Sequence, residues 1–178
     1  GEKSEGHELT FVAEWNDPNF EATHTIIWDF GDGSLGITGP QVDTAEYDYP
    51  YSTGTSSITH IYGDDGVYTV QVILQSIDGS QINDTIYLAI FNEVPILTLD
   101  SVSVSEGQEF FLNDIFTDLG WLDTHHIWID WGDGSVTVTD MEEENEYPLS
   151  SGSVPVSHVY GDNGQFEISV ILFDDEGD

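Results

Sequence analysis

The chain has 178 residues and a formal net charge of −34, because 35 aspartate and glutamate residues are set against a single lysine. Such a charge repels nucleic acid and anionic membranes, so we expect neither as a partner. The lack of cysteine excludes a disulfide framework and a thiolate metal site, and no apolar run is long enough to cross a bilayer.

The first half of the sequence alternates apolar and polar residues, which predicts strands at 8–15, 25–30, 67–75 and 82–91. Between them, residues 35–59 are polar and contain many glycine, serine, threonine and tyrosine residues, which indicates one or two short edge strands. No segment shows a helical period with capping residues. The sequence therefore predicts an all-β fold of short strands, which is typical of a sandwich.

The second half begins after a linker at 92–95 and repeats the pattern of the first. The alternation predicts strands at 96–104, 108–115, 126–131, 136–139, 154–158 and 166–173. The acidic run at 142–144 is interpreted as a solvated loop.

One heptapeptide shows that the two halves are copies of each other. Residues 28–34 read Trp-Asp-Phe-Gly-Asp-Gly-Ser and residues 129–135 read Ile-Asp-Trp-Gly-Asp-Gly-Ser. In both copies a strand runs into a tight turn, where glycine supplies the positive φ that a sharp reversal needs. A repeat of this length predicts two tandem domains, 1–92 and 93–178.

The two copies do not cover the same parts of the domain. Residues 94–104 of the second copy have no counterpart before Glu5, and residues 81–91 of the first copy have none after Gly177. We therefore expect the last strand of the second domain to be absent from the chain. The chain is expected to be a segment of a longer array or, alternatively, a subunit that is completed by strand exchange. Because no secretory leader precedes Gly1, we expect a mature or excised piece.

These motifs resemble the polycystic-kidney-disease (PKD) domain. The resemblance rests on the glycine-rich motif, on His-x-Tyr at 60–62 and on Gly-x-Tyr-Thr-Val at 66–70. The second copy resembles the PKD-like repeats of giant bacterial and archaeal surface proteins, through Phe-Thr-Asp at 116–118 and the motif at 129–135. The resemblance implies two immunoglobulin-like β-sandwiches that serve as spacer, adhesive or matrix modules. It does not imply catalysis.

The paired aspartates of the turn are interpreted as structural. Asp29 and Asp32 invite a general acid–base role, but they recur at the same turn as Asp130 and Asp133. A catalytic pair seldom recurs in tandem, whereas an aspartate that caps a glycine-rich turn is common. No Ser-His-Asp set, phosphate loop or cofactor fingerprint is present. We therefore expect no enzyme activity.

Four histidines are candidates for metal ligands or for structural anchors. His60 and His158 each stand two residues before a tyrosine, which favours a buried histidine beside a tyrosine corner. His24 and His125 precede strands, and we interpret them as loop anchors.

Calcium is the ligand that the composition favours, because it takes six to eight oxygens, which acidic loops and their carbonyls supply. Asn19 and Gly120 stand where the family often has an acidic residue, so the calcium ligands of the family do not transfer directly. The candidate ligands are Glu5, Asp17, Asn19, Asp64, Asp65, Asp78, Glu93, Glu106, Asp118, Asp123, Asp174 and Asp175.

The expected place of calcium is the junction of the two domains. The assumed strand order puts two carboxylate-rich ends face to face across Asn92 and Glu93, where calcium at or near the junction stiffens the array. The alternative is an acidic surface adapted to salt, with no discrete site.

The sequence thus predicts a non-catalytic extracellular module of a large cell-surface protein, acting in spacing, surface-layer or matrix assembly, or adhesion. Its expected partners are neighbouring domains of the same protein or like subunits, and polysaccharide or other surface proteins. The alternative is an accessory polysaccharide- or collagen-binding module of a secreted hydrolase. That alternative predicts an exposed planar aromatic strip drawn from Trp15, Tyr47, Tyr49, Tyr51, Trp121 and Trp128.

Overall fold

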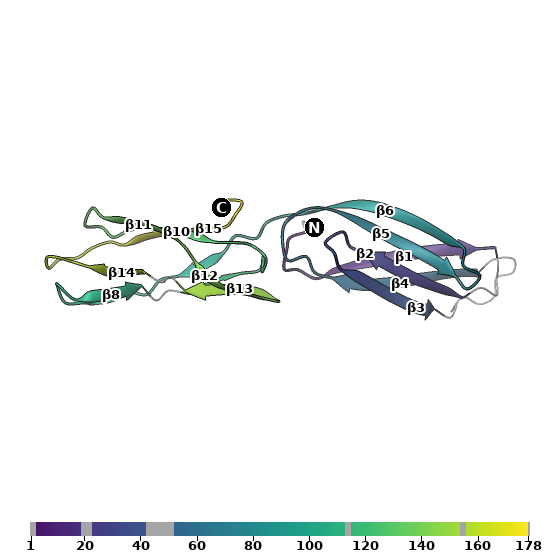
Figure 1. Ribbon diagram of the computed structural model, residues 1–178, viewed down its shortest axis with the longest axis horizontal. Coiled ribbons are helices and arrows are strands. Elements are labelled where there is room, and N and C mark those ends of the chain that lie inside the picture. The colour runs from purple at the N-terminus through teal and green to yellow at the C-terminus, as the bar shows by residue number, and fades with distance from the viewer. Residues whose placement is uncertain (1–2, 19–22, 42–51, 113–114, 154–155, 178) are drawn as a thin grey trace. The chain divides into compact units, whose positions relative to one another are not determined.

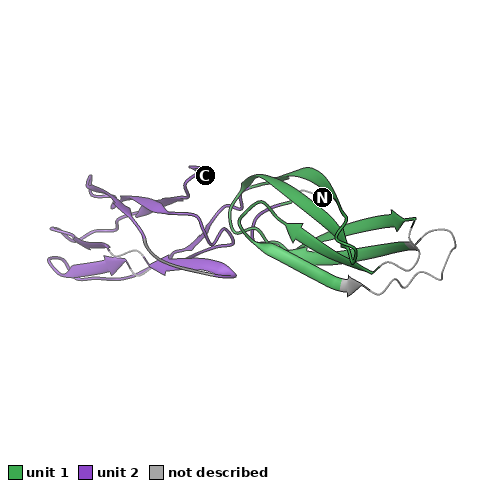
Figure 2. Ribbon diagram, turned by 45° about the vertical axis from the view of Figure 1, so that its right-hand side comes forward, with its two compact units in different colours: residues 1–3, 7–91 green, residues 4–6, 92–178 purple. Residues whose placement is uncertain are grey.

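The computed structural model describes residues 3–18, 23–41, 52–112, 115–153 and 156–177. All regular elements in these ranges are strands (Figure 1), which confirms the predicted all-β class. The same ranges hold no helix of the length and apolarity that a membrane crossing requires. The chain divides into two compact units (Figure 2), of which unit 1 comprises residues 1–3 and 7–91, and unit 2 comprises residues 4–6 and 92–178.

Unit 1 is a sandwich of two antiparallel sheets. Its strands are β1 (Leu9–Asp17), β2 (His24–Asp29), β3 (Leu35–Gln41), β4 (Ser52–His60), β5 (Gly66–Ser76) and β6 (Gln81–Ile90). β1 pairs with β4, and the second sheet has the order β3-β2-β5-β6. A 2.6 Å hydrogen bond between the hydroxyls of Thr38 and Ser56 joins β3 to β4 on one side of the sandwich.

The core of unit 1 consists of the apolar members of the sequence alternation, because successive side chains of a strand face opposite sides. Its buried residues are Phe11, Trp15, Ile26, Trp28, Phe30, Tyr62, Val70, Leu88 and Ile90.

Unit 2 repeats this architecture with shorter strands. They are β7 (Ile96–Thr98), β8 (Glu109–Leu112), β9 (Ile115–Asp118), β10 (His126–Asp130), β11 (Val136–Asp140), β12 (Glu142–Glu146), β13 (Leu149–Ser153), β14 (Val156–Val159) and β15 (Ser169–Phe173). The sheets have the orders β11-β10-β15, β12-β13-β9-β7 and β14-β8. Its buried core holds Leu112, Phe116, Ile127, Ile129, Trp131, Met141, Tyr160 and Leu172. The predicted immunoglobulin-like sandwich is thus confirmed.

Unit 2 differs from the sequence prediction in several details, which include the unpredicted strand β13 and a later start of β15 than the predicted residue 166. The run at 142–144 lies in β12 rather than in a loop, where it pairs with β13 at the edge of its sheet. The stretch predicted at 108–115 is divided into β8 and β9, and of the stretch predicted at 96–104 only β7 is a regular strand.

The repeated glycine-rich turn is fixed by close backbone packing. Gly31 has a φ of +81°, and a Cβ there would lie 2.7 Å from the carbonyl oxygen of Thr69. At the equivalent Gly132, φ is +75° and a Cβ would lie 2.5 Å from the carbonyl oxygen of Glu167. Only glycine combines this φ with this approach, so the motif is a folding requirement in both units.

Candidate metal centre

The turn aspartates are structural, as their repetition indicates. Asp29 Oδ1 accepts a hydrogen bond from the amide of Gly31 at 3.0 Å. Asp32 Oδ1 accepts hydrogen bonds from the amide and hydroxyl of Ser34 at 2.9 and 2.6 Å, and its Oδ2 lies 2.6 Å from His60 Nε2. The carboxylates are thus engaged in capping the turn and in holding a histidine.

The second turn repeats this arrangement. Asp133 Oδ1 accepts hydrogen bonds from Ser135, and its Oδ2 lies 2.7 Å from His158 Nε2. His158 stacks on Trp131 with ring centroids 4.6 Å apart, and Tyr160 donates a 3.0 Å hydrogen bond to the carbonyl of Trp131. The histidine and the tyrosine therefore lock the turn onto the core.

Hydrogen bonds lower the pKa of Asp32 and of Asp133, the second aspartate of each turn. The hydrogen bonds from Ser135, followed by that from His158, lower the pKa of Asp133 to about 2. Burial alone raises the pKa of Asp32, but the hydrogen bonds from Ser34 and His60 together outweigh burial and leave this pKa below its usual value. Both groups are therefore ionised at neutral pH and unsuited to proton transfer there.

A second pair of histidines lies at the start of β2 and just before β10, where they contact the aspartates that end β1 and β9. His24 Nε2 is 2.8 Å from Asp17 Oδ2 in unit 1, and His125 Nε2 is 2.8 Å from Asp118 Oδ2 in unit 2. The side chains of His125 and Asp118 are both fully buried, whereas the side chain of Asp17 is 22% exposed. In unit 2, Asp118 also accepts a 3.1 Å hydrogen bond from the amide of Gly120.

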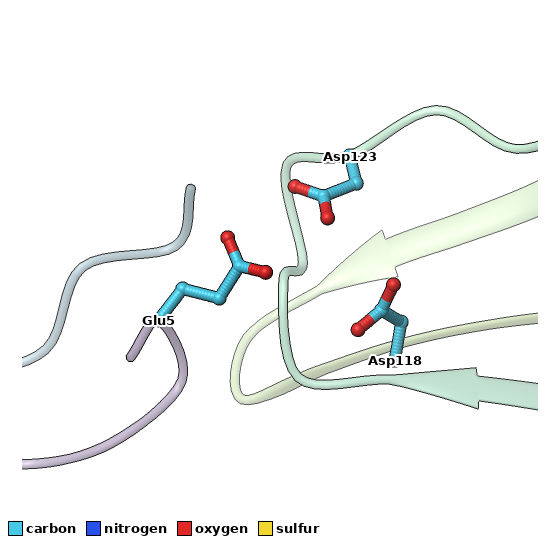
Figure 3. Close-up of side chains that lie close together, drawn as sticks. All are labelled: Glu5, Asp118 and Asp123. Atoms are coloured by element: carbon cyan, nitrogen blue, oxygen red, sulfur yellow. The ribbon is translucent and has the colours of Figure 1, made fainter. Parts of the chain in front are cut away.

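Three buried carboxylates meet beside His125, and one of them is its partner Asp118. Glu5, Asp118 and Asp123 are 0%, 2% and 0% exposed, and each offers an oxygen within 4.8 Å of the other two. Figure 3 shows the three side chains converging from two segments of chain, one with Glu5 and the other with Asp118 and Asp123, and both belong to unit 2. We call this set the carboxylate cluster. It joins Glu5 to two residues about 110 positions away, a proximity that only folding creates.

Backbone contacts position the members of the carboxylate cluster. The amide of Glu93 donates a 2.8 Å hydrogen bond to Glu5 Oε1. Gly6 has a φ of +69°, and a Cβ there would meet Leu119. A Cβ at Gly120 would overlap the carboxylate of Asp123. The two glycines thus allow both acidic side chains to approach, which explains why Gly120 stands where the family often has an acidic residue.

Asp123 also belongs to a more exposed acidic group with Asp175 and Glu176, whose ligand atoms lie within 4.8 Å of one another. Asp175 Oδ1 accepts a long hydrogen bond of 3.4 Å from the amide of Thr124. Glu176 was missed by the sequence reasoning, although it directly follows the predicted Asp174 and Asp175. The group extends the carboxylate cluster toward solvent.

Asp174 is buried but has a structural role. Its Oδ2 accepts a 2.7 Å hydrogen bond from the side-chain amide of Asn92, and its Oδ1 accepts one of 2.9 Å from the amide of Gly177. It therefore fixes the segments on which Glu93 and Asp175 lie.

The remaining predicted ligands lie elsewhere. Asp78 caps a turn by accepting hydrogen bonds from Ser80, and the carbonyls of Asp64 and Asp65 accept hydrogen bonds from the hydroxyl of Tyr68. Glu106 is exposed, and Glu93 contributes its amide as described above. Within the described ranges, none of Asp17, Asp78, Glu93 and Glu106 joins a group of three close ligand atoms. Asn19 lies outside the described residues.

The aromatic residues predicted to form an exposed strip for polysaccharide or collagen binding differ in their exposure. Trp15 is a core residue of unit 1 with 9% exposure, so its predicted place on an exposed strip is wrong. Trp121 and Trp128 are half-buried in unit 2. Tyr47, Tyr49 and Tyr51 lie outside the described residues.

Known proteins resemble the chain as follows. A protein-family model described as PKD domain matches residues 2–90, which is half of the 178 residues. Among solved structures, the chain is similar to fibronectin(III)-like modules of Clostridium thermocellum CbhA, with 18% identity and a TM-score of 0.27. That similarity covers 99% of this chain and 83% of that chain. No curated protein matches the chain.

Proposed function

The chain belongs to the PKD domain family, and we propose that it is a calcium-stabilised, non-catalytic structural module of a large cell-surface protein. Membership supports an extracellular structural or binding module, because PKD domains are usually extracellular and typically non-catalytic. In this proposal the module acts in spacing, in the assembly of a surface layer or matrix, or in adhesion. Its partners are neighbouring domains of the same protein or like subunits, with polysaccharide or other surface proteins as further partners.

The carboxylate cluster is the observation that supports calcium. Glu5, Asp118 and Asp123 are all buried, and two ionised carboxylates at this separation repel each other by about 3 kcal/mol at an effective dielectric constant near 20. A divalent cation among the three replaces this repulsion by attraction. Asp118 already has His125 as a partner at 2.8 Å, and a cation would be a partner that all three carboxylates share.

The donor set favours calcium over other ions. All three ligands are carboxylate oxygens, and the chain has no cysteine for a softer metal. Calcium–oxygen distances of about 2.3–2.6 Å place two ligands of one ion up to about 5 Å apart, in agreement with the spacing of the carboxylate cluster. Calcium also takes more than three oxygens, and backbone carbonyls and water complete its coordination in most sites.

Thermal unfolding of Asp123→Asn tests this proposal, because calcium binding and charge relief act in opposite directions. In chelator, the variant is expected to unfold at a higher temperature than the wild type, since one of the three buried charges is removed. In saturating calcium the order reverses, because calcium stabilises the wild type by about 4 kcal/mol at a thousand times its Kd and the variant by much less. Isothermal titration calorimetry should show the same loss of binding.

Asp17→Asn is the matched control, because it removes a charge from the corresponding end of unit 1. Its response to calcium should equal that of the wild type. Sodium chloride at matched ionic strength separates a discrete site from general screening. If sodium raises the unfolding temperature as much as calcium does, the acidic residues form a salt-adapted surface and the calcium proposal is wrong.

A further inference from the structure

The two sandwiches differ at one edge of equivalent strands. In unit 2, β9 has β13 on one edge and β7 on the other. In unit 1 the equivalent stretch is the end of β1, because Trp15 aligns with Phe116 in the repeat. β1 pairs with β4 alone among the described strands. Its other edge therefore presents unpaired backbone groups at the positions where β9 pairs with β7.

The facing edge of the second sheet is also uncovered. Leu88 and Ile90 of β6 face the core and are 5% and 3% exposed. Ile82 and Ile86 lie on the same face of this strand, since side chains two positions apart point the same way. They are nevertheless 64% and 51% exposed. The stretch of β6 (the edge strand labelled in Figure 1) from Ile82 to Ile86 thus turns two isoleucines, with Asp84 between them, toward an interior that the described residues leave open.

A groove runs between these two edges. Its two parts, of about 390 and 270 Å³, share Ala13, Glu14, Val72 and Asp84 and are therefore continuous. The opposite side of the sandwich is closed by the bond between Thr38 and Ser56. The groove is lined chiefly by Phe11, Ala13, Trp15, Val72, Ile82 and Ile86.

Two buried donors at the groove lack acceptors. The indole N–H groups of Trp15 and Trp28 have no hydrogen-bond partner among the described residues, although both rings are buried and both residues line the groove. Buried N–H groups are nearly always paired in folded proteins. The two unpaired donors therefore mark this side of unit 1 as incompletely packed among the described residues.

We propose that unit 1 accepts an extended strand in this groove, supplied from outside unit 1 and antiparallel to β1. β7 of unit 2 shows what such a strand is like. Its residues Ile96–Thr98 pair antiparallel with β9, and Leu97 packs against the core of unit 2. The surrounding residues 94–104 are largely aliphatic and hold one acidic residue, Asp100. A strand of this composition is repelled only weakly by a chain of net charge −34. The occupant is an extended apolar peptide strand of this kind.

The direct test uses a synthetic peptide of residues 94–104 with the full 178-residue chain. Binding is expected to raise the unfolding temperature of unit 1 with increasing peptide concentration. Amide chemical-shift changes in an NMR titration should be confined to β1, β6 and the groove floor. A peptide of the same composition with the alternation scrambled should not bind, because the apolar side chains no longer share one face.

Two exposed isoleucines provide matched variants. Ile86→Asp places a charge in the groove and should weaken peptide binding at least about tenfold, because the bound strand buries that charge. Ile37→Asp changes an equally exposed residue, 67% accessible on β3 at the opposite edge of the same sheet, and should leave the affinity within about twofold. Since both side chains are exposed, neither variant is expected to unfold the protein.

A covalent version keeps the test decisive where the free peptide binds weakly. Residue 102 aligns with residue 1 in the repeat, so a fusion of residues 94–101 ahead of Gly1 places the strand in register. The fusion should protect the amides of β1 from hydrogen exchange, and Ile86→Asp should remove that protection. Equal effects of native and scrambled sequences would overturn the proposal. So would sedimentation showing that the unmodified chain pairs with a second copy through this groove.

Discussion

The same aspartate–histidine pair joins the end of β1 to β2 in unit 1 and the end of β9 to the segment before β10 in unit 2, but its surroundings differ. In unit 1, Asp17 is partly exposed beside buried His24, and the residue aligned with Asp123 is Ala22. In unit 2, Asp118 and His125 are both fully buried, and Glu5 and Asp123 add two more buried carboxylates. The repeated motif is thus an anchor in both units. Among the described residues, it is part of a candidate metal centre only in unit 2, where other acidic residues join it.

Replacing the histidine of each aspartate–histidine pair is expected to give the largest difference in stability between the two units. His125→Ala leaves the buried carboxylate of Asp118 without its ion-pair partner and should destabilise unit 2 by about 3–5 kcal/mol. His24→Ala should cost unit 1 less, because the partly exposed Asp17 remains solvated and pairs of this kind contribute about 1 kcal/mol or less. Hydrogen exchange of β10 and β2 amides reports the two units separately.

Both variants are compared in chelator, and the ranking of the two is the critical result. Equal losses of stability in the two units would show that burial of the pair does not distinguish them.

A smaller change acts on the carboxylate cluster through packing alone. Gly120→Ala places a Cβ against the carboxylate of Asp123 and should weaken calcium binding about tenfold, by displacing one ligand. Gly161→Ala is the control, because a Cβ there meets no atom within 4 Å. Calorimetric titration of both variants compares them directly. Unchanged affinity in Gly120→Ala would exclude Asp123 as a ligand.

The smallest expected effect concerns pH and the two glycine-rich turns. The folded pKa of Asp133, about 2, lies below its ordinary value of 3.8. Its hydrogen bonds therefore stabilise the folded state above pH 4, and this stabilisation is lost as the pH falls from about 4 to about 2. Ser135→Ala should raise this pKa and weaken the acid dependence of stability, while Ser34→Ala should do the same at Asp32. Carboxyl NMR titrations measure both values, and an unshifted Asp133 pKa in Ser135→Ala would contradict the assigned cause.

The fold was largely predictable because its signals are local. The alternation of apolar and polar residues predicted β1, β2, β5 and β6 to within a residue or two. The acidic run in β12 was not predictable in this way, since pairing with β13 rather than residue type makes it a strand. β9 was not predicted as a separate strand, because the prediction at 108–115 covered β8 and ended at the first residue of β9, Ile115.

The sequence by itself determined the class of fold, the repeat, the turn chemistry and the acidic residues available for calcium. Only the tertiary structure decided which of those residues meet, because a carboxylate cluster built from Glu5, Asp118 and Asp123 depends on chain reversal over about 110 positions. It also decided that Trp15 is buried and that the groove beside β1 is open. Local patterns specify strands and faces, whereas burial and proximity depend on which strands are present to cover them.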